Sequence, residues 1–241
     1  MQFTGGNMED TTNTLRPGLF IMMKYPEVGN VKSRLAESVG DKVATNLYRA
    51  FIHDTLTTVR SLNVPFHIAV YPPDALEKFS HWLGLSYEFF RQEGKNLGER
   101  LQNGFALMFK NDYREVIAIG SDSPDLPPEI LQDAITSLQT NKVVIGPAKD
   151  GGYYLLGFSH DFFVPDAFSD VSWGTETVFQ ETLDRIRSVT NQVRVLPEWM
   201  DIDTKNDLRQ FYETYKMKRT KALYTMKFLR SHPDLLRALF A

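Results

Sequence analysis

Short apolar runs recur along the chain, separated by longer stretches in which apolar residues return every three or four positions. The short runs have the length and composition of buried strands, and the longer stretches have the periodicity of helices. Predicted strands lie at 19–23, 65–73, 87–92, 116–119 and 193–197, with a further pair in 143–158. Because strands alternate with helices almost throughout, the pattern predicts one α/β domain with three layers, α/β/α, and a mostly parallel sheet.

Several predicted helices begin at residues that commonly start helices. Asp41 precedes a long periodic stretch. Thr204 and Asp207 have the spacing of a capping box, with Asp in place of the usual Glu, and a helix is predicted over 205–230. A short helix follows Pro233.

The stretch 115–128, EVIAIGSDSPDLPP, places two carboxylates where a buried strand gives way to a loop. Ligands of open α/β sheets bind at this end of the strands. An unpaired carboxylate so close to the strand would be costly, and a hard cation would stabilise Asp122. The alternatives are that Asp122 only accepts hydrogen bonds from backbone amides and that Asp125 caps the next helix or turn. For Asp125, capping is the favoured interpretation.

A second polar segment follows the first predicted strand and contains Lys24, Lys32 and Arg34. A strand, a glycine-containing loop with cations and then a helix form the layout of a phosphate site. The P-loop and dinucleotide-binding glycine patterns are absent from this segment. Arg100, at a later strand-to-helix turn, is a further candidate for nucleotide or phosphate binding. The alternative is that these cations are solvated surface residues.

The segment 143–158 favours a hairpin, because Asp150 and Gly151 suit a tight turn. An equally weighted interpretation is that Gly151 and Gly152 let the backbone approach a ligand while Asp150 binds a hydroxyl group. Tyr153 and Tyr154 must point to opposite faces of a strand, so only one can face a pocket.

Two further features lie in the last third of the chain. Trp173 stands in an irregular linker and offers an aromatic face to a sugar or acceptor. Asp201 and Asp203 precede the predicted capping box, which explains Thr204 and Asp207 but neither of these two carboxylates.

Composition narrows the class of protein. The chain has 241 residues, 42% hydrophobic and 24% charged, which suits one large globular α/β core. It contains no cysteine, so disulfides, thiolate zinc sites and cysteine nucleophiles are excluded. No apolar run approaches the roughly 20 residues of a membrane span, and the first residues lack the pattern of a signal peptide. A cytoplasmic location is therefore predicted.

Charge is spread unevenly. The formal net charge is −3, yet the segment from Lys205 to the end carries nine Lys/Arg and three Asp/Glu, a net +6. No nucleic-acid motif accompanies this basic segment, so a solvated helix face is favoured and no nucleic-acid partner is predicted.

The predicted domain organisation has three parts. Residues 1–16 are expected to be a disordered leader, 17–215 a single domain, and 216–241 a helical extension. Apolar residues of the C-terminal helices can pack on the core or on a second copy of the chain, so a homodimer through these helices is one expectation.

Four segments stand together in order: the basic loop 24–35, GSDSPDLP at 120–127, DGGYYLLG at 150–157 and DIDTKNDL at 201–208. In this order they closely resemble the bacterial family of small GT-A-like nucleotide-diphospho-sugar transferases, some of which are assigned to arsenosugar biosynthesis. The resemblance covers about residues 17–215. The 2-phospholactate and molybdopterin guanylyltransferases are more distantly similar.

This resemblance implies a Rossmann-like GT-A fold and a Mg²⁺ or Mn²⁺ ion on the nucleotide diphosphate. It implies that Asp122 and Asp203 bind the metal. The residues it implies near the diphosphate and the sugar are Lys24, Lys32, Arg34, Asp150, Gly151 and Gly152. The sequence adds Arg100 at the nucleotide, and Tyr153 and Trp173 at the sugar or acceptor.

The predicted function is transfer of a sugar from a nucleotide-diphospho-sugar to a small-molecule acceptor. The metal would neutralise the leaving group, and Lys and Arg would stabilise the remaining charge. Asp150 is the candidate base, and Asp122 is the other candidate catalytic residue. The alternatives are a nucleotidyltransferase that uses an NTP and releases pyrophosphate, and a catalytically silent nucleotide-binding module.

Overall fold

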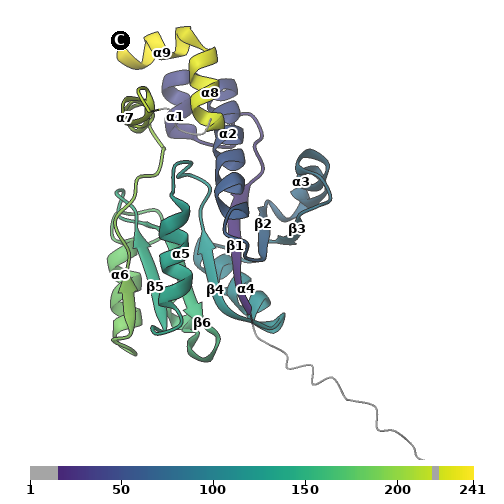
Figure 1. Cartoon of the computed structure of the whole chain (residues 1–241), viewed down its shortest axis with the longest axis vertical. Helices are drawn as coiled ribbons and strands as arrows, with labels where there is room; N and C mark the ends of the chain where they lie inside the picture. Colours follow the sequence, from purple (N-terminus) through teal and green to yellow (C-terminus); the bar gives the residue numbers. More distant parts are fainter. Residues whose placement is uncertain (1–15, 219–222) are drawn as a thin grey trace, which may run out of the picture.

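The computed structural model describes residues 16–218 and 223–241. Within these residues the chain forms a seven-stranded sheet with helices on both faces, which confirms the predicted α/β fold (Figure 1). The predicted leader lies outside the described residues, apart from Arg16, which begins the first strand. None of the described helices is long and apolar enough to cross a membrane.

The strands match the predicted apolar runs. They are β1 (Arg16–Lys24), β2 (Phe66–Tyr71), β3 (Glu88–Arg91), β4 (Tyr113–Ile119), β5 (Val143–Pro147), β6 (Tyr153–Ser159) and β7 (Val193–Val195). Their order across the sheet is β3-β2-β1-β4-β6-β5-β7. Only β6 runs against its neighbours, because it is the second strand of the predicted hairpin.

The helices lie between these strands and after them. They are α1 (Ser33–Val39), α2 (Asp41–Arg60), α3 (Leu76–Leu83), α4 (Leu97–Lys110), α5 (Pro128–Ser137), α6 (Val178–Arg187), α7 (Lys205–Tyr215), α8 (Tyr224–Ser231) and α9 (Pro233–Phe240). Short 3₁₀ turns occupy Pro73–Ala75, His160–Phe162 and Pro165–Phe168.

Alternation along β1 divides the core into two. Leu19 and Ile21 pack with α2, α5 and the C-terminal helices on one face of the sheet. Phe20 packs with α4 and α6 on the other face, where its ring meets Phe105 edge-on at 5.1 Å. Both faces are therefore covered, which explains why the inner strands are continuous apolar runs.

The C-terminal helices differ from the prediction. The single helix expected over 205–230 is two helices, because α7 ends at Tyr215 and α8 begins at Tyr224. Helix α8 packs on α2, and α9 packs on α7 and α8, at one end of the molecule (Figure 1). Asp54 of α2 accepts hydrogen bonds from the first two backbone amides of α8, so α8 begins where it docks on α2. Homodimerisation through these helices stays a prediction.

Candidate active site

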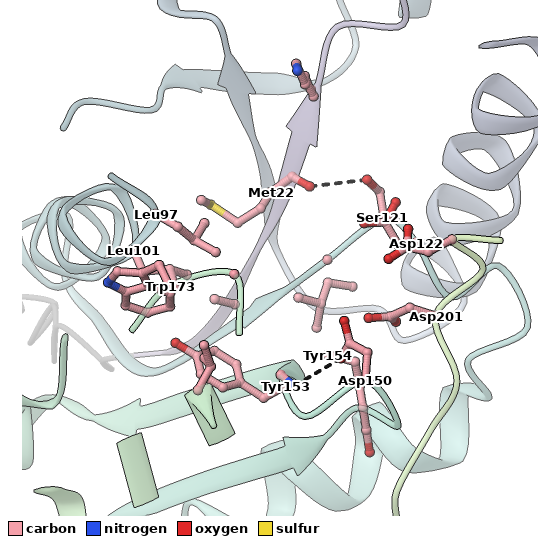
Figure 2. Close-up of a pocket in the computed structure, with 18 of the residues that line it drawn as sticks. Met22, Leu97, Leu101, Ser121, Asp122, Asp150, Tyr153, Tyr154, Trp173 and Asp201 are labelled. Atoms are coloured by element: carbon pink, nitrogen blue, oxygen red, sulfur yellow. Dashed lines mark hydrogen bonds between the residues drawn. The ribbon is translucent and has the colours of Figure 1, made fainter. Parts of the chain in front are cut away.

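A cavity of about 710 Å³ opens beyond the carboxyl ends of β1 and β4, beside the β5–β6 hairpin. This is the size of a pocket for a small molecule or a cofactor. The predicted site residues that line it are Lys24, Arg34, Arg100, Asp122, Asp150, Gly152, Tyr153, Trp173 and Asp203. Acidic side chains gather at one end, and apolar and aromatic side chains gather at the other (Figure 2).

The other two predicted residues lie just outside this cavity. Lys32 lines a smaller cavity of about 240 Å³, which shares Asp122 and Asp203 with the large one. Gly151 has a φ of +88°, and a Cβ added to it would lie 2.1 Å from the carbonyl oxygen of Glu176. Glycine is therefore required here to bring the hairpin turn against the loop that carries Trp173.

Asp122 and Asp203 both pair with the same cation, the side-chain ammonium of Lys32. The Nζ atom of Lys32 contacts Asp122 Oδ1 at 2.5 Å and Asp203 Oδ1 at 2.8 Å. Arg34 donates to the other oxygen of Asp203 at 2.9 Å. The two carboxylates share one nitrogen, so they lie side by side even though 81 positions separate them in the sequence.

Lys32 and Asp203 stabilise each other in their charged forms. Burial alone would lower the pKa of Lys32, but Asp122 and Asp203 hold that pKa above its usual value. Burial likewise opposes ionisation of Asp203, but Lys32 and Arg34 hold the pKa of Asp203 below its usual range. The result is a charged chain, Asp122–Lys32–Asp203–Arg34, at the edge of the pocket.

Hydrogen bonds join the loop after β4 to the segment before α7. The amide of Ile202 donates to the carbonyl of Asp122 at 2.9 Å, and Ser123 donates to Asp201. The prediction that Asp125 caps a helix or turn is wrong. Its carboxylate instead accepts from Trp199 Nε1 at 3.1 Å and from the hydroxyl of Tyr215 at 3.0 Å. The carboxylate turns inward because these distant donors converge on it.

Asp201 is a site residue that the sequence did not assign. It lines the large pocket beside Asp122 (Figure 2). Burial, followed by the negative charge of Asp122, raises the pKa of Asp201 to about 7. The one sequence signal was that the capping box explains Thr204 and Asp207 and leaves Asp201 without a role.

Tyr48 of α2 is a second unassigned residue. Its hydroxyl lies 2.9 Å from Ser121 Oγ and accepts a hydrogen bond from the backbone amide of Lys24 at 3.1 Å. Burial raises the pKa of Tyr48 to about 12, so the hydroxyl stays protonated. Tyr48 thereby ties the end of β1 to the loop after β4. It has no marker in the sequence beyond its place on the apolar face of a helix.

The far end of the pocket is apolar and aromatic. Trp173 and Tyr153 meet edge-on with ring centroids 6.4 Å apart, near Leu97 and Leu101 (Figure 2). Tyr153 and Tyr154 pack in opposite core clusters, as strand alternation predicts. Because a Cβ on Gly98 would lie 2.5 Å from the Trp173 ring, the indole packs directly on the backbone of α4.

Arg100 lies beside this apolar end. Its guanidinium stacks over the ring of Tyr71 at 3.8 Å and donates to the carbonyl of Gly94 at 3.2 Å. The flat face of the guanidinium is therefore held by the protein in a fixed orientation.

The acidic end offers a divalent ion two carboxylates, Asp122 and Asp203. Among the residues that the structure describes, no three Asp, Glu, His or Cys side chains form a complete metal site. Asp122 and Asp203 nevertheless place hard oxygen donors side by side. Mg²⁺ is commonly bound by one or two carboxylates together with substrate phosphates. These residues fit an ion completed by phosphate oxygens, and they do not fit an ion enclosed by protein.

Residues 55–175 match the family described as "Uncharacterized protein conserved in bacteria (DUF2064)". The chain belongs to this family. A crystal structure from Desulfovibrio desulfuricans G20, of a protein provisionally named a nucleotide-diphospho-sugar transferase, is 40% identical with a TM-score of 0.89. The match covers 93% of this chain and 98% of the other. The DUF2064 chain thus shares its architecture throughout with that protein. No functionally curated protein matches it.

More distant structures share the fold alone. Rv0371c from Mycobacterium tuberculosis H37Rv, in complex with manganese, is 16% identical with a TM-score of 0.52 over 83% of this chain and 100% of the other. The 4-diphosphocytidyl-2C-methyl-D-erythritol synthase from Anaerococcus prevotii DSM 20548 is 15% identical with a TM-score of 0.53 over 85% and 97%. The DUF2064 chain has a fold shared by nucleotide-diphospho-sugar transferases and nucleotidyltransferases.

Proposed function

We propose that the protein is a metal-dependent glycosyltransferase that moves a sugar from a nucleotide-diphospho-sugar to a small-molecule acceptor. The observation that carries the proposal is the two-ended pocket. One end combines carboxylates with cations, as a metal–diphosphate complex requires, and the other is aromatic (Figure 2). The provisional name of the relative that is 40% identical supports the same class of reaction.

The proposed contacts to the nucleotide are Lys24 and Arg34 at the charged end, together with Arg100 beside the apolar end. Arg34 is well placed for this role because its side chain is 64% exposed while its guanidinium is anchored on Asp203. Asp122, with Asp203 as the second ligand, would hold Mg²⁺ or Mn²⁺, and the ion would neutralise the leaving diphosphate when bound. Manganese suits an experiment because a distant fold relative has been crystallised with it.

At the other end, Trp173 and Tyr153 are the proposed aromatic contacts of the sugar or acceptor. Asp150 is the proposed base. It lies on the exposed hairpin turn, where its carboxylate accepts from the Gly152 amide at 3.0 Å. This bond holds the carboxylate at the pocket edge, where an acceptor hydroxyl would have to lie to be deprotonated by it.

Measuring the two leaving groups separately tests the proposal. The protein is incubated with Mn²⁺ and a panel of nucleotide-sugars, then with NTPs, while nucleoside diphosphate and pyrophosphate are followed separately. We expect slow release of nucleoside diphosphate, with water replacing the true acceptor. Asp122→Asn should abolish it. Asp161→Asn, which removes an exposed carboxylate paired with Lys142, is the matched control and should not.

The other outcomes separate the alternatives. Pyrophosphate release from an NTP, with every nucleotide-sugar inert, would replace the glycosyltransferase with a nucleotidyltransferase. Nucleotide binding without release of either product would indicate a silent binding module. Release of nucleoside diphosphate that persists in Asp122→Asn would refute the proposed role of Asp122 as a metal ligand.

A further inference from the structure

Lys32 is an unusual cation for a surface loop. It directly precedes α1, with a left-handed backbone of φ 51° and ψ 46°. Its side chain is only 4% exposed. The ammonium lies over the rings of Tyr48 and Phe51 on α2, 5.9 and 5.7 Å from their centroids. The side chain is therefore packed into the protein and is not free to move with solvent.

The position of this ammonium decides which carboxylate oxygens can be reached. Lys32 contacts Oδ1 of both Asp122 and Asp203, and Arg34 occupies Oδ2 of Asp203. Both oxygens of Asp203 are thus engaged by cations. Asp122 is engaged through one oxygen, and its side chain is 43% exposed at the pocket. A divalent ion held by both carboxylates would need oxygens within roughly 2.0–2.6 Å, in the space that Lys32 Nζ fills.

The local charges lead to the same result. Two carboxylates face two side-chain cations in the chain Asp122–Lys32–Asp203–Arg34, so the group is neutral before any ligand arrives. A divalent ion alone would meet the repulsion of a buried ammonium at contact distance. A divalent ion carried by a diphosphate brings its own negative charge, and the phosphate oxygens offer Lys32 and Arg34 new partners.

We propose that Lys32 is an internal competitor of the divalent ion, so that Asp122 and Asp203 bind metal together only when a diphosphate group accompanies it. The inference deepens the proposed function, since it states how the same site distinguishes a metal–diphosphate complex from a free metal ion. Lys32 acts here as a positioning residue. It holds the two carboxylates together and releases them to the incoming complex.

Mn²⁺ binding tests this without any turnover. Mn²⁺ alone is titrated into the wild-type protein and into Lys32→Met, and bound ion is measured by electron paramagnetic resonance and calorimetry. Losing one positive charge at contact distance should tighten binding of Mn²⁺ alone by roughly tenfold or more. The double variant Lys32→Met/Asp203→Asn should lose this gain. Lys142→Met breaks an exposed Lys–Asp pair outside the pocket and should bind like the wild type.

A second arm uses pyrophosphate as the diphosphate probe. In the wild type with saturating pyrophosphate, Mn²⁺ should bind more tightly than it binds to free pyrophosphate in solution. In Lys32→Met this enhancement should shrink. Thermal unfolding with and without Mn²⁺ reports on folding, and Mn²⁺ should raise the melting temperature of Lys32→Met more than that of the wild type. This arm does not depend on which bond the enzyme breaks, so failure of the sugar-transfer assay leaves it intact.

Three results would overturn the proposal. The first is wild-type protein that binds Mn²⁺ alone as tightly as it does with pyrophosphate. The second is folded Lys32→Met with unchanged or weaker affinity for Mn²⁺. The third is a gain in Lys32→Met that persists after Asp203→Asn. The first needs no variant, so a failure of Lys32→Met to fold does not remove the test.

Discussion

Asp54 is expected to hold the C-terminal helices on the core more strongly in acid than at neutral pH. Asp54 is 2% exposed, and its carboxylate accepts hydrogen bonds from the backbone amides of Tyr224 and Thr225 at 2.5 and 2.9 Å. The hydroxyl of Thr225 adds a third bond at 2.6 Å. A charged carboxylate at a helix N-terminus is usually stabilising. Burial opposes this effect and raises the pKa of Asp54 to about 6, from 3.8.

The sign and the size follow from linkage. Between pH 3.8 and about 6 the folded state keeps a proton on Asp54 that the unfolded state has lost. The free energy of unfolding therefore falls as pH rises through this window and is level above it. The difference between the two pKa values corresponds to about 3 kcal/mol. Asp54→Ala has no such titration. It loses roughly 1–3 kcal/mol for each donor left unpaired.

The assay is urea unfolding of the wild type and of Asp54→Ala at pH 4.5, 6 and 8. The wild type should be the more stable protein at pH 4.5, and its advantage should shrink by about 2 kcal/mol by pH 8, because part of the total change lies below pH 4.5. Asp166→Ala, an exposed carboxylate, serves as the control for general charge effects. An advantage that stays constant or grows with pH would show that the helix dipole and hydrogen bonds outweigh burial, and would refute the reasoning.

Three further changes test the site. Asp122→Asn should abolish Mn²⁺-dependent nucleotide binding in calorimetry and shift the melting temperature little, because Lys32 keeps its partner Asp203; unchanged binding would contradict it. Gly98→Ala should push Trp173 from its place, cost about 1–3 kcal/mol and alter tryptophan emission; emission like the wild type's would count against it. Tyr48→Phe should lower the free energy of unfolding in urea by about 1–2 kcal/mol and weaken nucleotide binding, since the backbone amide of Lys24 loses its acceptor. Unaltered binding would show that Tyr48 contributes to stability alone.

Periodicity was enough to predict the layers of the fold, and the resemblance of four ordered segments implied that Asp122 and Asp203 act together. Each carboxylate comes near the carboxyl end of a predicted strand, and such ends meet at one edge of a parallel sheet. The hairpin at 143–158 could also be predicted from the sequence, because a short polar turn separates two apolar runs. These features depend on local pattern, which a sequence carries directly.

Other features depended on partners far along the chain. Nothing near Asp125 indicates that Trp199 and Tyr215 will converge on it, so the local alternative of a cap was favoured and was wrong. Asp201 and Asp203 are nearly equivalent in sequence, yet one accepts from Ser123 and the other pairs with Lys32. The partner of a side chain is set by packing, and packing sums contacts over the whole fold.

The succession of strands and helices, and the chemical types brought to one sheet edge, can be read from the sequence because both follow from residue periodicity and from chain direction. The lysine that stands between the two predicted metal ligands could not be foreseen in this way, because its position depends on the folded structure. That outcome needs a left-handed residue at Lys32, two aromatic rings from α2 and a carboxylate from the segment before α7. The two rings and the carboxylate lie outside the basic loop, and the ammonium is buried only because they meet Lys32 in the fold.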